Sequence, residues 1–152
     1  MTYGWAILVL GIVLSLLFTS GIFTPSYLVS EECNLGPKIL CNFVIYQDSG
    51  ATKLAINATN GFGYKIKITG IDIYMPEEDK SFAIPTQEYI AESGGSFVIE
   101  GKIADYTAAK NSIKKLKSEI EYYSCADEVN PACDAAVANK HKLTGRIIGR
   151  VA

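Results

Sequence analysis

The distribution of charge constrains the fold of this 152-residue chain more than any other feature. Residues 1–30 contain no Asp, Glu, Lys or Arg, so all 30 charged residues fall among the other 122. About one residue in four is then charged in that remainder, which is the usual share for a globular domain. The sequence therefore predicts a hydrophobic N-terminal segment joined to a water-soluble head.

The hydrophobic segment runs from Thr2 to Phe23. A helix of about 20 apolar residues covers the roughly 30 Å hydrocarbon core of a bilayer, and Pro25 is expected to end or kink such a helix. Three interpretations compete: a cleaved secretory signal, a permanent membrane anchor, and a helix that later packs against its own copies. The lack of a basic stretch ahead of the apolar run disfavours the cleaved signal. Hydropathy alone favours the anchor, although Gly4, Gly11 and Gly21 are small sites at which helices can approach closely.

The head shows the alternation of apolar and polar residues that is typical of half-buried strands. The clearest runs are residues 39–46, 52–58, 64–75, 96–103 and 142–151. The apolar face changes parity near Thr69-Gly70, which predicts a β-bulge there. Residues 105–124 fit either an amphipathic helix or a strand from about residue 115, and we favour the strand. Six or so short strands favour a β-sandwich or a barrel.

The four cysteines form two local pairs in the sequence, Cys33 with Cys41 and Cys125 with Cys133. Four cysteines allow three pairings, of which the local one requires the least topology. Free structural thiols and a metal site are the alternatives. A zinc site is disfavoured because the spacing is not C-x-x-C and His141 is the only histidine. An even count beside a hydrophobic segment favours two disulfides in an oxidising, extracellular setting.

Asn57-Ala58-Thr59 is a sequon for N-glycosylation. If residues 52–58 form a strand, the Asn57 side chain points away from Leu54 and Ile56, toward solvent. The sequence therefore predicts Asn57 as a glycosylation site of an extracellular head.

Basic residues near the C-terminus gather on one face if the last two strands pair. They are Lys114, Lys115, Lys117, Lys140, Lys142, Arg146 and Arg150. Such a face would attract phosphates or anionic glycans. We favour the alternative of a solvated face that Glu119 and Glu121 partly neutralise, and we expect no binding of nucleic acid.

The sequence contains no constellation typical of an enzyme. It has no G-x-S-x-G motif, no phosphate-binding glycine-rich loop and no pair of histidines. Glu77, Glu78 and Asp79 are interpreted as a solvated acidic turn in preference to a cation site. We therefore expect a protein that is not an enzyme and has no cofactor, no metal and no catalytic residue.

Several segments resemble one known family. They are Met1–Val9 (MTYGWAILV), Gly21–Ser26 (GIFTPS), the Cys33/Cys41 loop, Asn60–Gly63 (NGFG) leading into Ile66–Thr69 (IKIT), and Leu143–Gly149 (LTGRIIG). Together they resemble archaeal type IV pilin-like proteins that carry a class III signal peptide. Precursors of that family have a basic leader and residues ending in Glu-Tyr-Leu ahead of the opening motif. This chain starts at the Met, which leaves open whether Met1 is the mature N-terminus.

The resemblance implies an α+β fold, with a long hydrophobic N-terminal helix followed by an Ig-like antiparallel β-sandwich head. The expected parts are a membrane or filament-core helix (1–25), a linker (26–38) and the head (39–152). The helix is expected to lie in the membrane before assembly and then to form the core of a filament. The residues expected in that core are Trp5, Ile7, Leu10, Gly11, Leu14, Phe18, Gly21 and Phe23.

The resemblance thus implies the major subunit of an extracellular type IV pilus-like filament that serves adhesion or contact between cells. The expected partners are copies of the chain, the membrane before assembly, and glycans or a neighbouring surface. The opening differs from that of archaellins, which disfavours a swimming filament. The alternatives are a minor pilin and a membrane-anchored extracellular module that binds a glycan or a protein.

Overall fold

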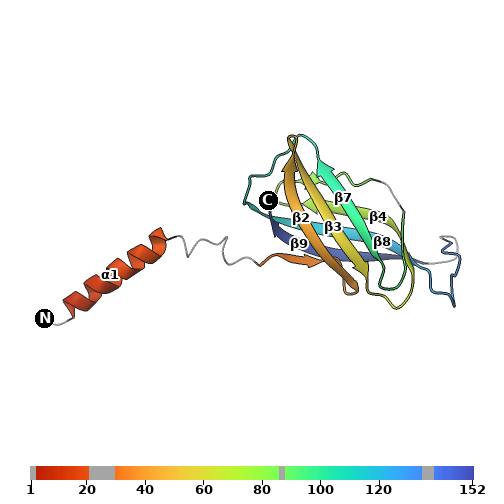
Figure 1. The fold of residues 1–152 in the computed structure, drawn as a ribbon, viewed down its shortest axis with the longest axis horizontal. Coiled ribbons are helices and arrows are strands. Elements are labelled where there is room, and N and C mark those ends of the chain that lie inside the picture. Colours follow the sequence, from red (N-terminus) through yellow and green to blue (C-terminus); the bar gives the residue numbers. More distant parts are fainter. Residues whose placement is uncertain (1–2, 21–29, 86–87, 135–138) are drawn as a thin grey trace. The chain divides into compact units, whose positions relative to one another are not determined.

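The computed structural model describes residues 3–20, 30–85, 88–134 and 139–152 (Figure 1). The chain divides into two compact units, Met1–Ser30 and Glu31–Ala152. The first unit contains the helix α1, and the second contains the strands β1 to β9.

Helix α1 spans Gly4–Thr19, which is 16 residues. At 1.5 Å per residue it is about 24 Å long, shorter than the roughly 30 Å core of a bilayer. Its last turn is closed by hydroxyl groups, because Thr19 Oγ1 donates a hydrogen bond to the Ser15 carbonyl (3.0 Å) and Ser20 Oγ donates one to the Leu17 carbonyl (2.8 Å). Within the described part of the chain, no helix combines the length and the hydropathy required to cross a membrane.

The predicted fold class is therefore wrong. The chain is not an α+β protein with a long hydrophobic helix, because strands make up most of the described residues and α1 is short. The prediction counted apolar residues as far as Phe23, but hydropathy does not register serine and threonine hydroxyls that bond to backbone carbonyls at a helix end. Gly21 and Phe23, which were predicted to belong to the helix, lie outside the described residues.

The second unit consists of two antiparallel sheets. The larger sheet has the order β1 (Glu32–Asn34), β9 (Lys140–Arg150), β8 (Ile113–Ser124) and β4 (Ile66–Met75), and β4 also pairs with β5 (Lys80–Ser81) and β6 (Tyr89–Ala91). The smaller sheet has the order β2 (Ile39–Asp48), β3 (Ala51–Asn60) and β7 (Ser96–Ile103). Figure 1 shows the smaller sheet lying in front of the larger one.

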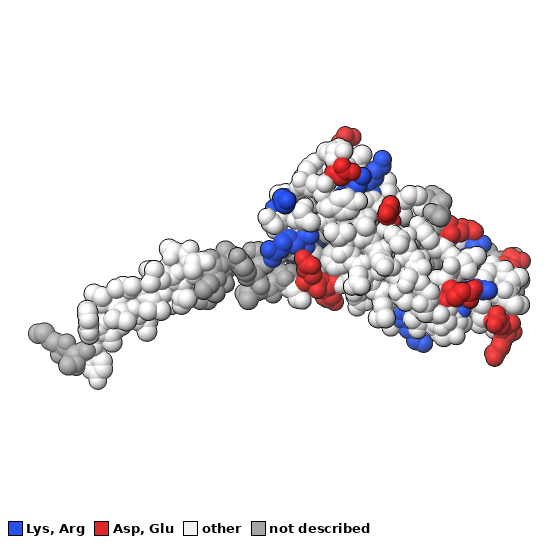
Figure 2. Space-filling model, viewed as in Figure 1, with Lys and Arg blue, Asp and Glu red and all other residues white. Residues whose placement is uncertain are grey.

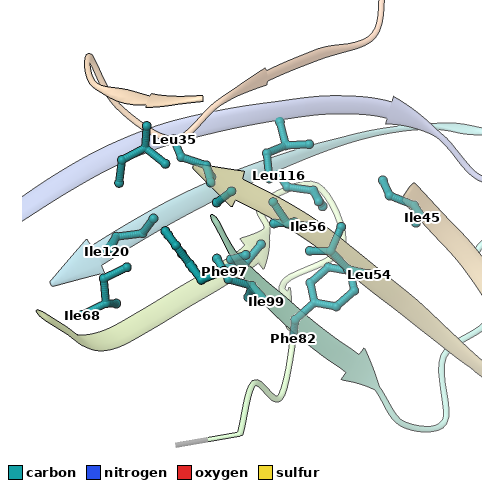
Figure 3. Close-up of a cluster of buried hydrophobic side chains, with 14 of the residues drawn as sticks. Leu35, Ile45, Leu54, Ile56, Ile68, Phe82, Phe97, Ile99, Leu116 and Ile120 are labelled. Atoms are coloured by element: carbon teal, nitrogen blue, oxygen red, sulfur yellow. The ribbon is translucent and has the colours of Figure 1, made fainter. Parts of the chain in front are cut away.

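The hydrophobic core lies between the two sheets (Figure 3). Leu54 and Ile56 of β3 are 1% and 0% exposed, and they share the core with Leu116 and Ile120 of β8. Isoleucine predominates because its branched Cβ suits a pleated surface that is buried on one side. Leu35, in the loop after β1, also lies fully in this core. The core therefore includes Leu35, which belongs to the predicted linker 26–38. Strand β1 also lies within that predicted linker.

Two glycines of β9 permit close packing. A Cβ added to Gly145 would lie 2.6 Å from Ser118 Oγ and 2.7 Å from Leu35 Cα, and it would clash with the carbonyl oxygen of Asn34. A Cβ added to Gly149 would overlap the ring of Phe43. These two glycines therefore allow Asn34, Leu35 and Phe43 to approach the inner face of β9 closely.

Most of the detailed strand predictions are confirmed. Residues 113–124 form a strand, and the register between β4 and β8 shifts between Ile68 and Gly70, where the bulge was predicted. The turn between β2 and β3 consists of Ser49 and Gly50, whose φ angles are 51° and 78°. Two successive residues with positive φ match the right-handed twist of the strands that they join.

Candidate functional site

Helix α1 presents an apolar surface on every side. None of its side chains is buried within this unit. The predicted core residues Trp5, Ile7, Leu10, Leu14 and Phe18 are 75%, 72%, 63%, 43% and 69% exposed. In water this surface is unfavourable, since burying a large apolar side chain contributes about 1.5–3 kcal/mol. This apolar surface is not covered within the helix's own unit.

Gly11 lies in the middle of α1 and has open space around it. A Cβ added there would meet no atom within 4 Å. Gly4 is equally open. The sequence prediction that these positions offer small contact sites for another helix is compatible with this geometry, because no described atom of the helix's own unit occupies the space.

Both predicted disulfides are present, and no described cysteine is free. The Cys33–Cys41 bond, with a Cα–Cα distance of 5.7 Å, joins β1 of the larger sheet to β2 of the smaller one. It therefore closes the two sheets at this edge. Arg146 of β9 supports the same edge through a paired contact with the Glu32 carboxylate, at 3.0 and 3.2 Å.

The Cys125–Cys133 bond closes the loop that follows β8, with a Cα–Cα distance of 4.8 Å. Asn130 lies buried inside this loop, where its amide group donates to the carbonyls of Ser124 (3.2 Å) and Asp134 (3.1 Å). Val129 at the surface is 70% exposed. The loop is thus held by internal bonds, and it presents an apolar side chain to solvent.

The outer face of the larger sheet carries ion pairs in place of a basic surface. Lys142 contacts Glu119 and Glu121, and Lys140 also contacts Glu121. Toward β4, Lys115 pairs with Glu77, while Lys114, which has the parity of the buried residues of β8, pairs with Glu78. The predicted pairing of the last two strands is confirmed, and so is the interpretation that carboxylates neutralise the face.

These ion pairs shift the pKa values of two side chains on this sheet. The hydrogen bond from Lys140 lowers the pKa of the Glu121 carboxyl, against a smaller desolvation effect that raises it, and Lys142 adds to the lowering. Burial alone lowers the pKa of the Lys114 ammonium, but its hydrogen bonds to Glu78 and Tyr106 make the net change an increase. Both groups are therefore held in their charged forms.

The outer face of the smaller sheet is different, because one end of it carries no charge. Three cross-strand rows make up most of this region: Leu40, Thr59 and Ser96; Asn42, Asn57 and Val98; Val44, Ala55 and Glu100. Glu100 is the one charged residue of these rows and marks the end of the region. Leu40 is 71% exposed, Val98 50% and Val44 44%. In Figure 2 the middle of the face over β2, β3 and β7 is white. We call the eight uncharged residues of these rows the uncharged face.

Asn57 lies at the centre of the uncharged face. Its side chain is exposed, as predicted, and its cross-strand neighbours are Asn42 of β2 and Val98 of β7. A groove of about 610 Å³ begins beside it and extends to the Cys33–Cys41 disulfide. The polar walls of the groove include Asn34, Asn42 and Thr59.

Sequence reasoning identified Asn57 and the cysteines but missed the uncharged face. The available signal was the outward parity of Leu40, Val44 and Val98, which alternate with buried residues in their strands. A single sequence does not reveal which strands are neighbours, so the three positions remained unconnected.

Within residues 3–20, 30–85, 88–134 and 139–152, no three His, Cys, Asp or Glu side chains are grouped as metal ligands. His141 is exposed and stacks on the Tyr122 ring, with a centroid distance of 5.2 Å. No protein-family model and no curated protein matches the chain.

Proposed function

We propose that this chain is the major structural subunit of an extracellular filament of the type IV pilus kind, built by packing α1 helices of many copies together. The observation that carries this proposal is the all-round apolar surface of α1, which has no buried side chain and no charge. An amphipathic helix would cover one side of its own domain. A helix that is apolar on all sides is buried among other helices or in lipid.

Copies of such a helix can form an extended polymer. A contact between two different surfaces of the same chain, repeated without closing, generates a helical filament rather than a ring. Trp5 and Phe18 offer large areas for such contacts, and Gly4 and Gly11 allow backbones to come close. Because α1 is uncharged, burial among copies leaves no isolated charge in an apolar core.

The head supports a location outside the cell. Two disulfides in a unit of 122 residues are typical of oxidising compartments. We propose that the head forms the outer surface of the filament, and that the filament serves adhesion to a surface or contact between cells.

The first test is electron microscopy of filaments sheared from native cells, with mass spectrometry of their major protein. We expect this chain to be the bulk component. Its presence only in the cell fraction, with filaments made of another protein, would exclude the role of major subunit. A role as a minor subunit or an anchored binding module would then replace it.

Two variants test the role of α1 directly. Gly11→Lys should abolish filaments, because a buried unpaired charge costs several kcal/mol. Gly11→Leu adds no charge, places its Cβ where no described atom of the helix's unit lies within 4 Å, and improves helix propensity by about 1 kcal/mol. The Gly11→Leu variant should lower the number of filaments only if neighbouring helices pack closely at Gly11.

Gly63→Lys is the matched control in the head, since a Cβ there also meets nothing within 4 Å. It should leave filaments intact. Normal filaments from Gly11→Lys would refute the proposal that α1 forms their core, provided that the variant chain is incorporated. Loss of filaments in both lysine variants would point to a general defect in export or folding.

A further inference from the structure

We propose that Asn57 carries an N-linked glycan whose first sugars occupy the groove beside the Cys33–Cys41 disulfide, and whose remainder covers the uncharged face. This proposal concerns the head alone, so it does not depend on whether the chain polymerises. It rests on three features that coincide: a sequon, an uncharged face with exposed apolar side chains, and an adjacent polar groove.

The sequon is presented on a single face of the head. Asn57 and Thr59 lie two positions apart in β3, so their side chains emerge on the same side of the sheet. Strand β3 is the middle strand of the smaller sheet, which places Asn57 between Asn42 and Val98. Asn57 is exposed, and Thr59 Oγ1 lies 2.9 Å from Ser96 Oγ at the surface. The Asn57 amide is therefore accessible from outside in the folded head.

The surface around Asn57 lacks the usual protection of an exposed sheet. Outward charges normally keep such a face soluble and prevent contact with other sheets. Here the nearest charges in the ladder are Glu100 and, one row beyond, Lys53 and Lys102. Leu40 and Val98, on the two sides of Asn57, are 71% and 50% exposed. A hydrated glycan at the centre of this face would cover the exposed apolar side chains on both sides of Asn57.

The groove suits the first sugars of such a glycan. Its volume of about 610 Å³ lies within the range of small-molecule sites. Asn34, Asn42, Thr59 and the Glu32 carboxylate line it with hydrogen-bonding groups, while Leu40 provides an apolar wall. Amides and hydroxyls can bond to sugar hydroxyls, and an apolar wall suits the C–H face of a sugar ring. Asn57 itself lines the groove, so a sugar on its side chain starts inside it.

The attachment requires a lipid-linked oligosaccharide as donor and a transferase of the cell that makes the protein, neither of which belongs to this chain. A bond forms between Asn57 Nδ2 and the anomeric carbon of the first sugar. The bond between that carbon and the lipid phosphate oxygen breaks, and the lipid phosphate leaves with the electron pair. A basic group of the transferase takes the proton that the amide nitrogen loses. The product is neutral at Asn57.

Mass spectrometry of the full chain from its native host tests the attachment. We expect a glycan mass on the peptide that contains Asn57, and its complete loss in Asn57→Gln. Thr59→Ser keeps the hydroxyl that the sequon requires and should retain the mass, whereas Thr59→Val should lose it. An unmodified Asn57 in the native chain would overturn the proposal.

Hydroxyl-radical labelling tests the cover. In the native chain Leu40 and Val98 should label weakly despite their exposure in the bare head, and both should label more strongly in Asn57→Gln. Val129, which is 70% exposed in the loop after β8, is the internal control and should label equally in both proteins. Equal labelling of Leu40 and Val98 in the two proteins would show that any glycan points away, which would overturn the covering role.

Discussion

Replacing Gly145 by alanine should destabilise the head, although alanine is normally the better residue within a strand. Gly→Ala at an ordinary position stabilises by roughly 0.5–1 kcal/mol through reduced backbone entropy of the unfolded chain. At Gly145 the new Cβ would lie 2.7 Å from Leu35 Cα and would clash with the Asn34 carbonyl oxygen. These are backbone atoms, so the segment after β1 must move as a whole.

The expected cost follows from what that segment holds. Overpacking a tight site costs about 1–3 kcal/mol, and moving this segment also weakens the pairing of β1 with β9 and the burial of Leu35. We therefore expect a net loss of about 2–3 kcal/mol. For a head of 122 residues, this loss corresponds to a fall in Tm of about 8–12 °C.

The assay is thermal unfolding of the full chain in detergent, followed by circular dichroism in the β-sheet region. Gly63→Ala is the control, because its Cβ would meet nothing within 4 Å, and its Tm should be unchanged or higher by up to about 4 °C. An unchanged Tm for Gly145→Ala would refute the close approach of the segment after β1 to β9. A lower Tm in both variants would mean that strain at Gly145 is not the cause.

Three further predictions concern the head. Replacing both Cys33 and Cys41 by serine should lower the free energy of unfolding by about 2–3 kcal/mol, the loop-closure value for a separation of 8 residues, as measured by urea denaturation. Ile56→Ala should cost about 2–5 kcal/mol in the same assay, because Ile56 is 0% exposed in the core. The pKa of Glu121 is lowered by Lys140, so its stabilising contribution is present above pH 4.5 and is lost as the pH falls through the folded-state pKa. Glu121→Gln should therefore be less stable than the wild type at pH 7 and equal to it in strong acid; a difference that is independent of pH would contradict this.

The sequence predicted the strands well because each one carries its own evidence. In β8, Leu116, Ile120 and Tyr122 alternate with charged residues at a period of two, which favours a strand even though the spacing of Leu116 and Ile120 alone also fits a helix. The bulge was predictable from the change in parity around Thr69-Gly70, and the disulfides from the spacing of four cysteines. These features are local, so they need no knowledge of which strands are neighbours.

The remaining features depend on information that is not local. Strand β1 has only three residues, and its pairing with β9 joins positions more than 100 residues apart in the chain. The uncharged face requires the register of β2, β3 and β7, because Leu40 and Val98 come together only through β3. The length of α1 was overestimated for a different reason: apolar residues continue to Phe23, whereas hydroxyls at Thr19 and Ser20 close the last turn.

The two proposals together limit which surfaces can hold a filament together. A glycan over the uncharged face leaves that face unavailable for contacts between heads, while the outer face of the larger sheet is dominated by ion pairs such as Lys142 with Glu119. Contacts through ion pairs weaken with salt, since the Debye length falls from about 8 Å at 0.15 M to about 3 Å at 1 M. Contacts between α1 helices contain no charge, and salts excluded from apolar surfaces strengthen them.

Filaments should therefore persist when ionic strength is raised with sulfate to about 1 M, because the helices rather than the heads hold them together. Sedimentation of sheared filaments, with electron microscopy of the pellet, measures this directly. The Glu119→Gln variant is the matched control, since it removes one partner of an ion pair on the larger sheet and should sediment like the wild type. If filaments dissolved into subunits in salt, or if Glu119→Gln alone released them, the charged face of the head and not α1 would be the main contact between copies.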